Sequence, residues 1–268
     1  MPLVIILDDY VVSRFIPDRW RNQMKKVAII QSNYIPWKGY FDIIHDVDLF
    51  VFLDDVQYTV RDWRNRNRIK TPHGLHWLTV PVGSDRDRLI HEVQILGNDW
   101  GKSHWELIRH NYSKTPYYKL YKEFFEHVYL VTRWTSLSEL NQYLVRKISQ
   151  DFLGIEVEFK DSRRFNAQGH KFERLLELLD KTGAEYYVSG PAAMDYIDED
   201  RMAEVGYELH YKDYSGYPEY PQLYPPFEHS VTILDLLFNC GPDTPFYIWG
   251  WREGMKLDNA ISYSEYSK

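Results

Sequence analysis

The hydrophobic and polar positions near the start of the chain predict a strand, a helix and a second strand in close succession. The run "KKVAIIQS" (25–32) is apolar and rich in β-branched residues, and "DLFVFLDD" (48–55) is a second apolar run. Between them, "GYFDIIHDV" (39–47) has its apolar residues at helical spacing. Two apolar strands joined through a helix are typical of a βαβ unit, so we expect a parallel sheet.

The same alternation continues along most of the chain, and no internal repeat, low-complexity tract or linker interrupts it. An amphipathic helical stretch, broken at Pro116, occupies the middle. Strands are expected at 76–82 and 91–96 (as a hairpin), 155–160, 186–188 and 206–214, and helices at 136–154, 169–183 and 229–241. The pattern predicts one compact α/β domain with a mainly parallel, Rossmann-like sheet and a helical middle segment.

Residues 1–23 stand apart from this pattern. Met24 opens "MKKVAII", which reads as the start of the first strand, so we interpret residues 1–23 as an N-terminal extension and residues 24–268 as the domain. The alternative is an edge strand or a swapped arm, because "LVIIL" has high β propensity.

Charge and composition narrow the classes of protein. The 268 residues include 32 lysines and arginines against 39 aspartates and glutamates, so a general nucleic-acid binder is not favoured. The one cysteine, Cys240, fits a reducing compartment, and no apolar run approaches the roughly 20 residues of a membrane span. The chain starts without the basic and small-residue features of a signal peptide. We expect a cytoplasmic protein.

Polar residues follow three of the expected strands, and in a parallel sheet the strand ends meet at one edge. Gln31, Asn33, Trp37 and Gly39 stand in the first of these loops, where Pro36 and Gly39 mark a turn into a helix whose free N–H groups could hold an anion. The alternative is an ordinary turn with Trp37 as part of the core. Ser189 and Gly190 follow the strand at 186–188.

The second expected strand ends in a pair of carboxylates. Asp54 and Asp55 emerge there, with Gln57 and Tyr58 just beyond. Carboxylates in this position bind ribose hydroxyls, coordinate Mg²⁺ or accept protons. The alternative is a helix cap or a solvated corner.

The stretch "RDWRNRNRIK" (61–70) sets five cations against one acid. If it is helical, Arg61, Arg64 and Arg68 share one face, and if it is extended, Arg64, Arg66, Arg68 and Lys70 share one. Arginine forks match phosphate oxygens, and Asn65 adds an amide for a sugar hydroxyl, so we expect a phosphate or diphosphate with a sugar or nucleoside attached. The alternative is a solvated basic face.

Other chemistry is sparse. His104, at the head of a helix, is either a general base or a satisfied surface histidine. No pair of histidines has metal-ligand spacing with a carboxylate or cysteine partner, so no metal site is predicted. Cys240 lies at an apolar helix end and is expected to be structural.

The motifs together resemble the WbqC-like family over residues 25–241. The residues that carry the resemblance are "QSNYIPWKGYFDIIHDVDLFVFLDDVQYTVRDWRNRNRIK", "WLTVPV", "YYVSGPAAMDYID" and "YPQLYPPFEHSVTILDLLFNCG". Members of the family sit in O-antigen and other surface-polysaccharide gene clusters. The resemblance implies transfer of glycine to an amino sugar.

A second resemblance is at the level of the fold. Strand, "PWKGY", helix, strand is similar to the adenylyl-transferring superfamily that includes pantothenate synthetase, which grips ATP with two histidines in this turn. Trp37 and Tyr40 stand near those positions here. This departure weakens the case for activation by ATP.

Our first hypothesis is therefore an enzyme that forms an amide, transferring a glycyl-type acyl group to the amino group of a nucleotide-linked sugar. The partner would be that sugar or another phosphorylated small molecule, with Asp54 or His104 as the base and Arg64, Arg66, Arg68 and Lys70 on the diphosphate. Asp54, Gln57 and Tyr58 would orient the sugar or nucleoside, and Asn33 and the turn at Gly39 would hold the donor. The sequence does not name the cofactor, which would be ATP with Mg²⁺ or a donor such as a coenzyme A thioester, nor the oligomeric state. The alternatives are nucleotidylyl transfer to a sugar phosphate and a non-catalytic carbohydrate-binding or assembly protein.

Overall fold

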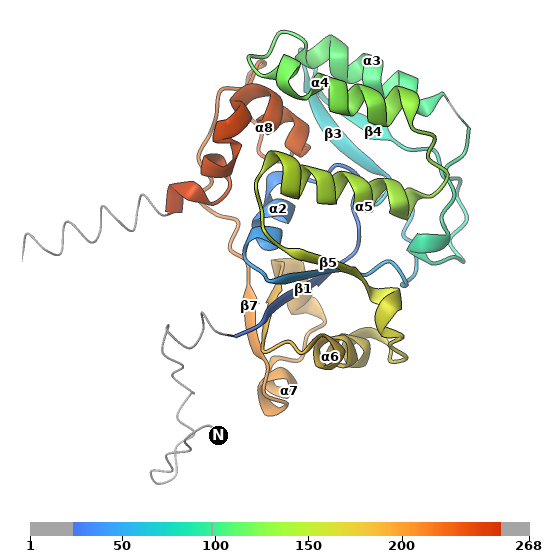
Figure 1. The fold of residues 1–268 in the computed structure, drawn as a ribbon, viewed down its shortest axis with the longest axis vertical. Coiled ribbons are helices and arrows are strands. Elements are labelled where there is room, and N and C mark those ends of the chain that lie inside the picture. The colour runs from blue at the N-terminus through green and yellow to red at the C-terminus, as the bar shows by residue number, and fades with distance from the viewer. Residues whose placement is uncertain (1–23, 98, 253–268) are drawn as a thin grey trace, which may run out of the picture.

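A sheet of five parallel strands forms the centre of the structure, in the order β5-β2-β1-β6-β7 (Figure 1). The computed structural model describes residues 24–97 and 99–252, so the expected extension over residues 1–23 lies outside the described residues. The strands are β1 (Lys26–Ile30), β2 (Leu49–Phe52), β5 (Glu158–Asp161), β6 (Tyr186–Ser189) and β7 (Glu208–Tyr211). All neighbouring pairs are parallel, which confirms the α/β fold expected from the sequence.

The order of the strands reverses beside β1. The chain adds β2 and β5 on one side of β1, and then crosses to the other side for β6 and β7. Ligands of open α/β sheets bind outside the carboxyl ends of the strands at such a reversal. The topology therefore directs attention to the carboxyl ends of β1 and β6.

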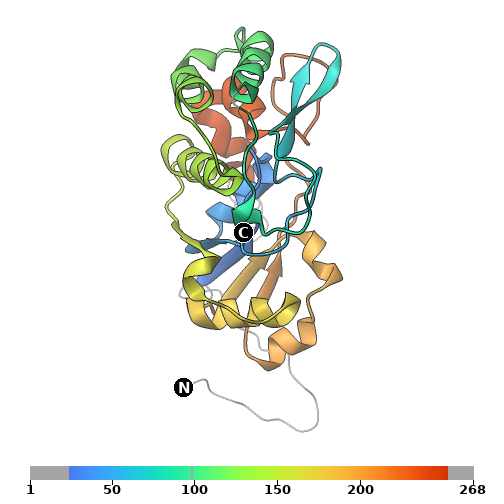
Figure 2. The same cartoon turned by 90° about the vertical axis from the view of Figure 1, so that its right-hand side faces the viewer.

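Helices cover both faces of the sheet (Figures 1 and 2). Alternate residues of β1 serve the two layers: Val27 and Ile29 pack in the core that includes Leu178, whereas Ala28 belongs to the larger core on the other face. One face carries α6 (Lys171–Thr182) and α7 (Glu199–Glu204), and the other carries α2 (Lys38–His45) and α5 (Leu137–Lys147).

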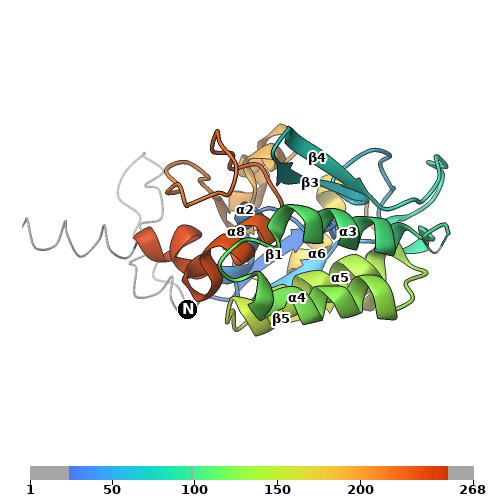
Figure 3. The same cartoon turned by 90° about the horizontal axis from the view of Figure 1, so that it is seen from above.

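The middle of the chain forms a helical layer above α2, seen from above in Figure 3. It contains α3 (Trp100–Tyr112), α4 (Tyr118–Glu126) and α5, and the C-terminal helix α8 (Ile233–Cys240) packs beside α4. This confirms the expected helical middle segment. Of the helices in residues 24–97 and 99–252, none is both long and apolar enough to cross a membrane.

The helix ends follow the capping signals of the sequence. Ser136 accepts a hydrogen bond from the N–H of Glu139 at the start of α5, and Gly183 ends α6 with a φ of +66°. The expected helix at 136–154 continues beyond α5 as a π turn. Two π turns (His127–Val131 and Ile148–Phe152) and four 3₁₀ turns (Ile90–Glu92, Ser162–Phe165, Pro191–Asp195 and Gly241–Tyr247) complete the described helices.

The hairpin differs from the sequence prediction. Its strands are β3 (Arg66–Thr71) and β4 (Gly74–Thr79), so the arginine-rich stretch itself pairs with the strand expected at 76–82. The segment expected as a strand at 91–96 instead begins with a 3₁₀ turn. The prediction was wrong because Asn67 is a polar residue at a buried position of β3. The stretch therefore lacks the alternation of apolar and polar residues by which a strand is recognised.

Asp54 joins three elements at the carboxyl end of the sheet. Its side chain is fully buried, and it accepts hydrogen bonds from the N–H of Ser32 (2.9 Å), the Ser138 hydroxyl and Gln142 Nε2 (3.0 Å). Gln142 Nε2 also donates to Asp161 at the end of β5 (2.8 Å). One carboxylate thus fixes the loop after β1 and helix α5 against the end of β2.

We expect Asp54→Ala to destabilise the fold strongly, because it removes the acceptor of the buried Ser32 N–H and Ser138 hydroxyl and one of the acceptors of Gln142. The loss should be roughly 3 kcal/mol or more, which lowers Tm by roughly 6–12 °C in a domain of this size. Thermal unfolding followed by circular dichroism measures the change. Asp87→Ala, at an exposed aspartate, is the control and should leave Tm nearly unchanged. Equal Tm values for the two variants would contradict the structural role of Asp54.

Candidate functional site

A cleft opens at the carboxyl ends of β1 and β6, where the strand order reverses. Its volume is about 670 Å³, and we call it the switch-point cleft. Gln31 and Asn33 line it from the loop after β1, Trp37 from the start of α2, and Ser189 and Gly190 from the end of β6. With Arg64, which also lines the cleft, six residues that the sequence analysis selected share it.

The loop after β1 is held in a strained conformation. Ile35 has a φ of +35°, which β-branched residues rarely adopt. Asn67 of β3 donates from Nδ2 to the carbonyl oxygens of Tyr34 (3.1 Å) and Ile35 (2.8 Å). On the other side, the N–H of Ile233 in α8 donates to the Pro36 carbonyl oxygen (2.9 Å). Strain that neighbouring contacts maintain is typical of ligand sites, and here it fixes the loop that lines the cleft.

Asn33 has a carboxamide without a protein partner. Its Oδ1 is buried, and no donor in the described part of the chain reaches it. Leaving such a carbonyl oxygen unsatisfied costs about 1–3 kcal/mol. A ligand that donates a hydrogen bond to Oδ1 would remove this cost.

The Trp37 ring forms an aromatic wall of the cleft. It makes an edge contact with Tyr214, with 4.9 Å between the ring centroids. A Cβ atom on Gly39 would lie 2.3 Å from Cζ2 of Trp37, so the ring rests against the glycine. Gly39 was selected as part of an anion-holding turn. It is instead buried in the first turn of α2, where it makes room for Trp37.

Cations enter the cleft from two sides. Arg64 leaves only 16% of its side chain exposed, contacts Asp62 at 3.0 Å and has a buried Nε without an acceptor. Burial lowers the pKa of Arg64. Arg174 of α6 pairs with Asp55, and its Nε is also buried without an acceptor. Lys171, the first residue of α6, has a φ of +50° and also lines the cleft.

The charged side chains that line the cleft are all positive. Among the described residues that line it, three are cations and none is a carboxylate or a histidine. Partly buried arginines whose Nε atoms lack acceptors favour an anion, because the charge is no longer fully solvated. The arrangement is suited to a phosphate or diphosphate group.

A second, smaller cleft adjoins the first. It has a volume of about 230 Å³ and lies between the β1 loop and the hairpin, so we call it the hairpin cleft. Asn33 and Trp37 line both clefts, and Trp63, Arg68 and Ser230 line only the second. Asn33 and Trp37 therefore stand at the junction of two neighbouring binding spaces.

The outer face of the hairpin alternates arginine and tryptophan. The Arg66 guanidinium lies 4.2 Å from the ring centroid of Trp77, and Arg68 lies 5.7 Å from Trp63 and 5.5 Å from Trp77. Trp63 and Trp77 are 42% and 39% exposed. The two arginines do share a face, as expected for an extended segment. Because they stack on indole rings, the face is both cationic and aromatic.

Asp54 and His104 do not fit the role of a general base. Asp54 is buried and all its hydrogen bonds go to the protein, as described above. His104 is 5% exposed, with Nδ1 2.8 Å from the Tyr34 hydroxyl and Nε2 3.2 Å from the Thr79 carbonyl oxygen. Burial lowers the pKa of His104 to about 4, so the ring is neutral at pH 7. It lies outside the residues that line the two clefts.

Two polar residues of the arginine-rich stretch support the hairpin instead of a ligand. Asn65 is buried and donates to the Val80 carbonyl oxygen (3.0 Å). Lys70 is 3% exposed, and its Nζ donates to Gln222 Oε1 (2.7 Å) and to the Pro226 carbonyl oxygen. Neither is among the residues that line the two clefts.

Gln57 and Tyr58 also lie outside the lining of both clefts. Gln57 is exposed and donates to the Arg86 carbonyl oxygen (3.4 Å). Tyr58 is 1% exposed, and Arg88 lies 5.2 Å from its ring centroid. The roles in sugar binding expected of these two residues have no support in their positions.

Sequence reasoning missed three residues that line the switch-point cleft: Lys171, Arg174 and Tyr214. Lys171 and Arg174 begin a helix that was expected correctly, and helix N-termini after a strand commonly face the ligand edge of a sheet. That position was the available signal. Tyr214 follows β7, and its hydroxyl lies 3.3 Å from the place a Cβ atom on Gly190 would occupy. No sequence signal marks this approach.

Comparison with known proteins gives a family. The model of the WbqC-like protein family matches residues 31–246. The chain belongs to the WbqC-like family. An uncharacterized protein of Mycobacterium tuberculosis, Rv1507c, is 46% identical over 228 residues, which cover 84% of this chain and 98% of that protein. No solved structure matches.

In this WbqC-like protein, the family match includes all the residues that line the hairpin cleft and, apart from Ile29 and Ile30, those that line the switch-point cleft. The matched region begins at Gln31, at the end of β1, and extends past α8. The relative in M. tuberculosis is uncharacterized, so the comparisons give membership without an activity.

We expect Gly39→Ala to disturb the aromatic wall, because the new methyl group would displace the Trp37 ring. The overpacking should cost about 1–3 kcal/mol, and the tryptophan fluorescence spectrum should shift as well. Gly250→Ala is the control, since the nearest atom to its Cβ position is 3.7 Å away. A Gly39→Ala variant with unchanged unfolding and fluorescence would show that Trp37 does not depend on Gly39.

Proposed function

We propose that this WbqC-like protein is an enzyme that binds a nucleotide-linked amino sugar in the switch-point cleft and transfers an acyl group, such as glycyl, to the sugar's amino group. The observation that carries the proposal is the buried, unpaired Arg64 Nε in a cleft lined without carboxylates. The acyl group, the amino sugar and the link to surface-polysaccharide synthesis in this proposal come from the family resemblance. The proposed binding of an anion rests on the residues that line the cleft.

The acceptor's diphosphate would be held by Arg64 on one side and by Lys171 at the start of α6 on the other. Arginine offers its fork to two phosphate oxygens at once, whereas Lys171 acts as a point charge. Trp37 and Tyr214 would provide the flat surfaces against which a sugar or base ring packs. The cleft volume of about 670 Å³ lies within the range typical of small-molecule sites, roughly 300–1,000 Å³.

Asn33 would hold the reacting amine. Its free Oδ1 accepts a hydrogen bond from an N–H of a neutral amine, which leaves the nitrogen lone pair directed away from Oδ1. Because Asn33 lines both clefts, a nitrogen bound there faces the hairpin cleft. The residue would orient the amine without accepting its proton.

The hairpin cleft would take the activated acyl donor, with Trp63 and Arg68 against its nucleotide portion. With a thioester donor, the amine nitrogen attacks the carbonyl carbon, the C–N bond forms and the C–S bond breaks. The nitrogen loses a proton, and the departing thiolate takes up a proton to leave as a thiol. This assignment explains why two clefts share a wall at Asn33 and Trp37.

Arg64→Ala tests the acceptor site. We expect binding of a UDP-linked amino sugar, measured by titration calorimetry, to weaken about 10- to 100-fold, because a charge-assisted bond to phosphate is lost. Arg66→Ala is the matched control, since Arg66 is in the same stretch but stacks on Trp77 outside both clefts. Unchanged affinity in Arg64→Ala, or an equal loss in Arg66→Ala, would place the phosphate elsewhere.

Asn33→Ala tests the position of the amine. Amide formation from the nucleotide-linked amino sugar and an acyl thioester should fall in kcat by about 10²-fold or more, with a smaller change in the acceptor's KM. Asn33→Gln keeps the carboxamide but moves it by one methylene, so it should also fail to restore kcat. If Asn33→Ala raises KM alone, Asn33 contributes only to binding.

A further inference from the structure

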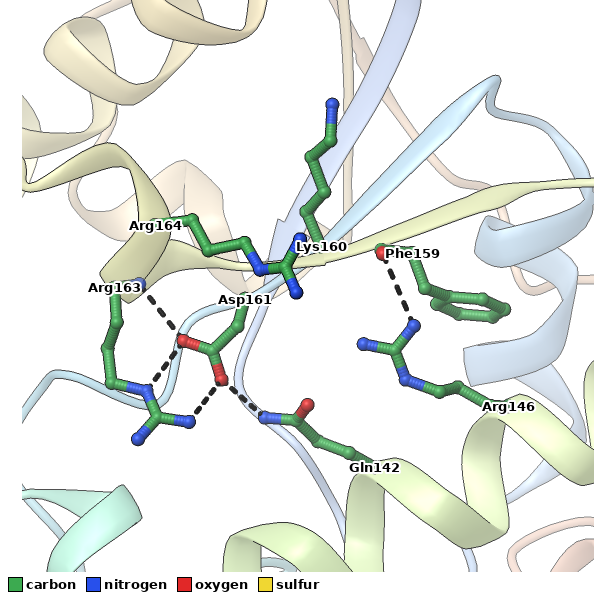
Figure 4. Close-up of a pocket in the computed structure, with 7 residues that line it drawn as sticks. All are labelled: Gln142, Arg146, Phe159, Lys160, Asp161, Arg163 and Arg164. Carbon is green, nitrogen blue, oxygen red and sulfur yellow. Dashed lines mark hydrogen bonds and ion pairs between the residues drawn. The ribbon is translucent and has the colours of Figure 1, made fainter.

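A second basic concavity lies at the β5 edge of the sheet, away from the residues assigned above. It has a volume of about 520 Å³. Its lining includes Arg146 from α5, and Lys160, Asp161, Arg163 and Arg164 from β5 and the turn that follows it. In Figure 4 the Arg164 side chain extends over Asp161, whereas the Lys160 side chain points to the opposite side of the strand. We call it the β5-edge concavity. It shares no lining residue with the switch-point or hairpin cleft.

The carboxylates near the concavity already have partners. Asp161 accepts from Arg163 at Nε (2.8 Å) and Nη2 (2.9 Å), and from Gln142 Nε2 (2.8 Å). Glu158 pairs with Lys160 at 2.9 Å. These contacts satisfy two of the four cations, Arg163 and Lys160.

The other two cations, Arg146 and Arg164, make no ion pair with any carboxylate in residues 24–97 and 99–252. The Arg146 guanidinium is fixed: it lies 5.0 Å from the ring centroids of both Phe52 and Phe159, and Nη1 donates to the Phe159 carbonyl oxygen (3.2 Å). Burial lowers the pKa of Arg146; the nearby charge of Asp161 opposes this shift, and the charge of Arg164 adds to it.

Two arginines of like charge are thus held near each other with one of them partly desolvated. An anion bound between them would stabilise both charges, and Arg146 most, because it is the partly desolvated one. Because Arg146 is immobilised on the two phenylalanine rings, its free N–H groups are preorganised for a planar or tetrahedral oxyanion. Arg146 and Arg164 also form a local positive field that attracts anions, which Asp161 in the same concavity offsets only in part, because Asp161 already pairs with Arg163.

We infer that the β5-edge concavity binds a phosphate or diphosphate group between Arg146 and Arg164. The inference does not depend on the proposed acyl transfer, because it uses a different set of residues. The diphosphate of a nucleotide and free pyrophosphate would make the same contacts with the two arginines. A nucleotide would bind more tightly only if its nucleoside makes contacts of its own.

The test is calorimetric titration of the full chain carrying Arg64→Ala, so that the switch-point cleft contributes less to the binding measured. Inorganic pyrophosphate and ADP are the probes, at low and at physiological salt. We expect saturable binding to remain in Arg64→Ala and to weaken about 10- to 100-fold when Arg164→Ala is added. Arg164 is exposed, so its substitution should leave the thermal unfolding unchanged.

Arg133→Ala, also added to Arg64→Ala, is the control for loss of one exposed positive charge, and should bind pyrophosphate as before. Tighter binding of ADP than of pyrophosphate would identify the ligand as a nucleotide, and equal binding would identify the phosphate groups alone as the ligand. No saturable binding in Arg64→Ala, or equal losses from Arg164→Ala and Arg133→Ala, would overturn the inference. Neither result would bear on nucleotide-sugar binding in the switch-point cleft, which Arg64→Ala tests against the unsubstituted chain.

Discussion

The buried carboxylate of Asp54 is the constraint on which the ligand edge of the sheet depends. A charge with no exposure to water is tolerated only when several donors surround it, and here Ser32, Ser138 and Gln142 supply them from the β1 loop and α5. Gln142 extends the same network to Asp161 at the end of β5. The positions of three neighbouring strand ends are therefore coupled through polar contacts, while the apolar cores fix the faces of the sheet. From the sequence, a carboxylate at a strand end such as that of Asp54 is a candidate catalytic group. Because Asp54 is buried, it instead stabilises the positions of the residues that face the clefts.

The hairpin and α8 complete this support from the other side of the β1 loop. Asn67 occupies an inward position of β3, where it satisfies two loop carbonyl oxygens, and Ile233 satisfies a third. The loop keeps an unfavourable φ at Ile35 because these contacts leave it no relaxed alternative. As a result Asn33 is presented at the junction of two clefts with its carboxamide unpaired. Preorganisation of this kind reduces the ordering that a bound substrate would otherwise require.

The sequence was sufficient for the parallel sheet and the main helices because their signals are local. Apolar runs mark β1 and β2, and cap residues such as Ser136 and Gly183 mark helix ends. The partner of β4 was missed because Asn67 is buried by tertiary contacts that no spacing rule anticipates. Part of the site could be predicted because the loops that follow neighbouring parallel strands lie at the same edge of the sheet. Gln31, Asn33, Ser189 and Gly190 therefore line one cleft. Burial decided the rest, since a sequence does not show that the side chains of Asp54 and His104 point into the protein.

The stretch "RDWRNRNRIK" shows how much the environment decides what a charge does. Arg64 turns into the switch-point cleft, Arg66 lies against Trp77, Arg68 lines the hairpin cleft, and Lys70 is tied to Gln222 in the interior. Extended geometry places Arg66 and Arg68 on one face. The two guanidinium groups nevertheless have different surroundings and different contacts, so their charges are solvated to different degrees. A cation that is partly desolvated gains most from binding phosphate, and Arg64 is such a cation: it lines the switch-point cleft, is 16% exposed, and keeps a buried Nε without an acceptor beside its ion pair with Asp62. We therefore expect anion binding to depend on which arginines are partly buried in a cleft, and not on the number of arginines in the stretch.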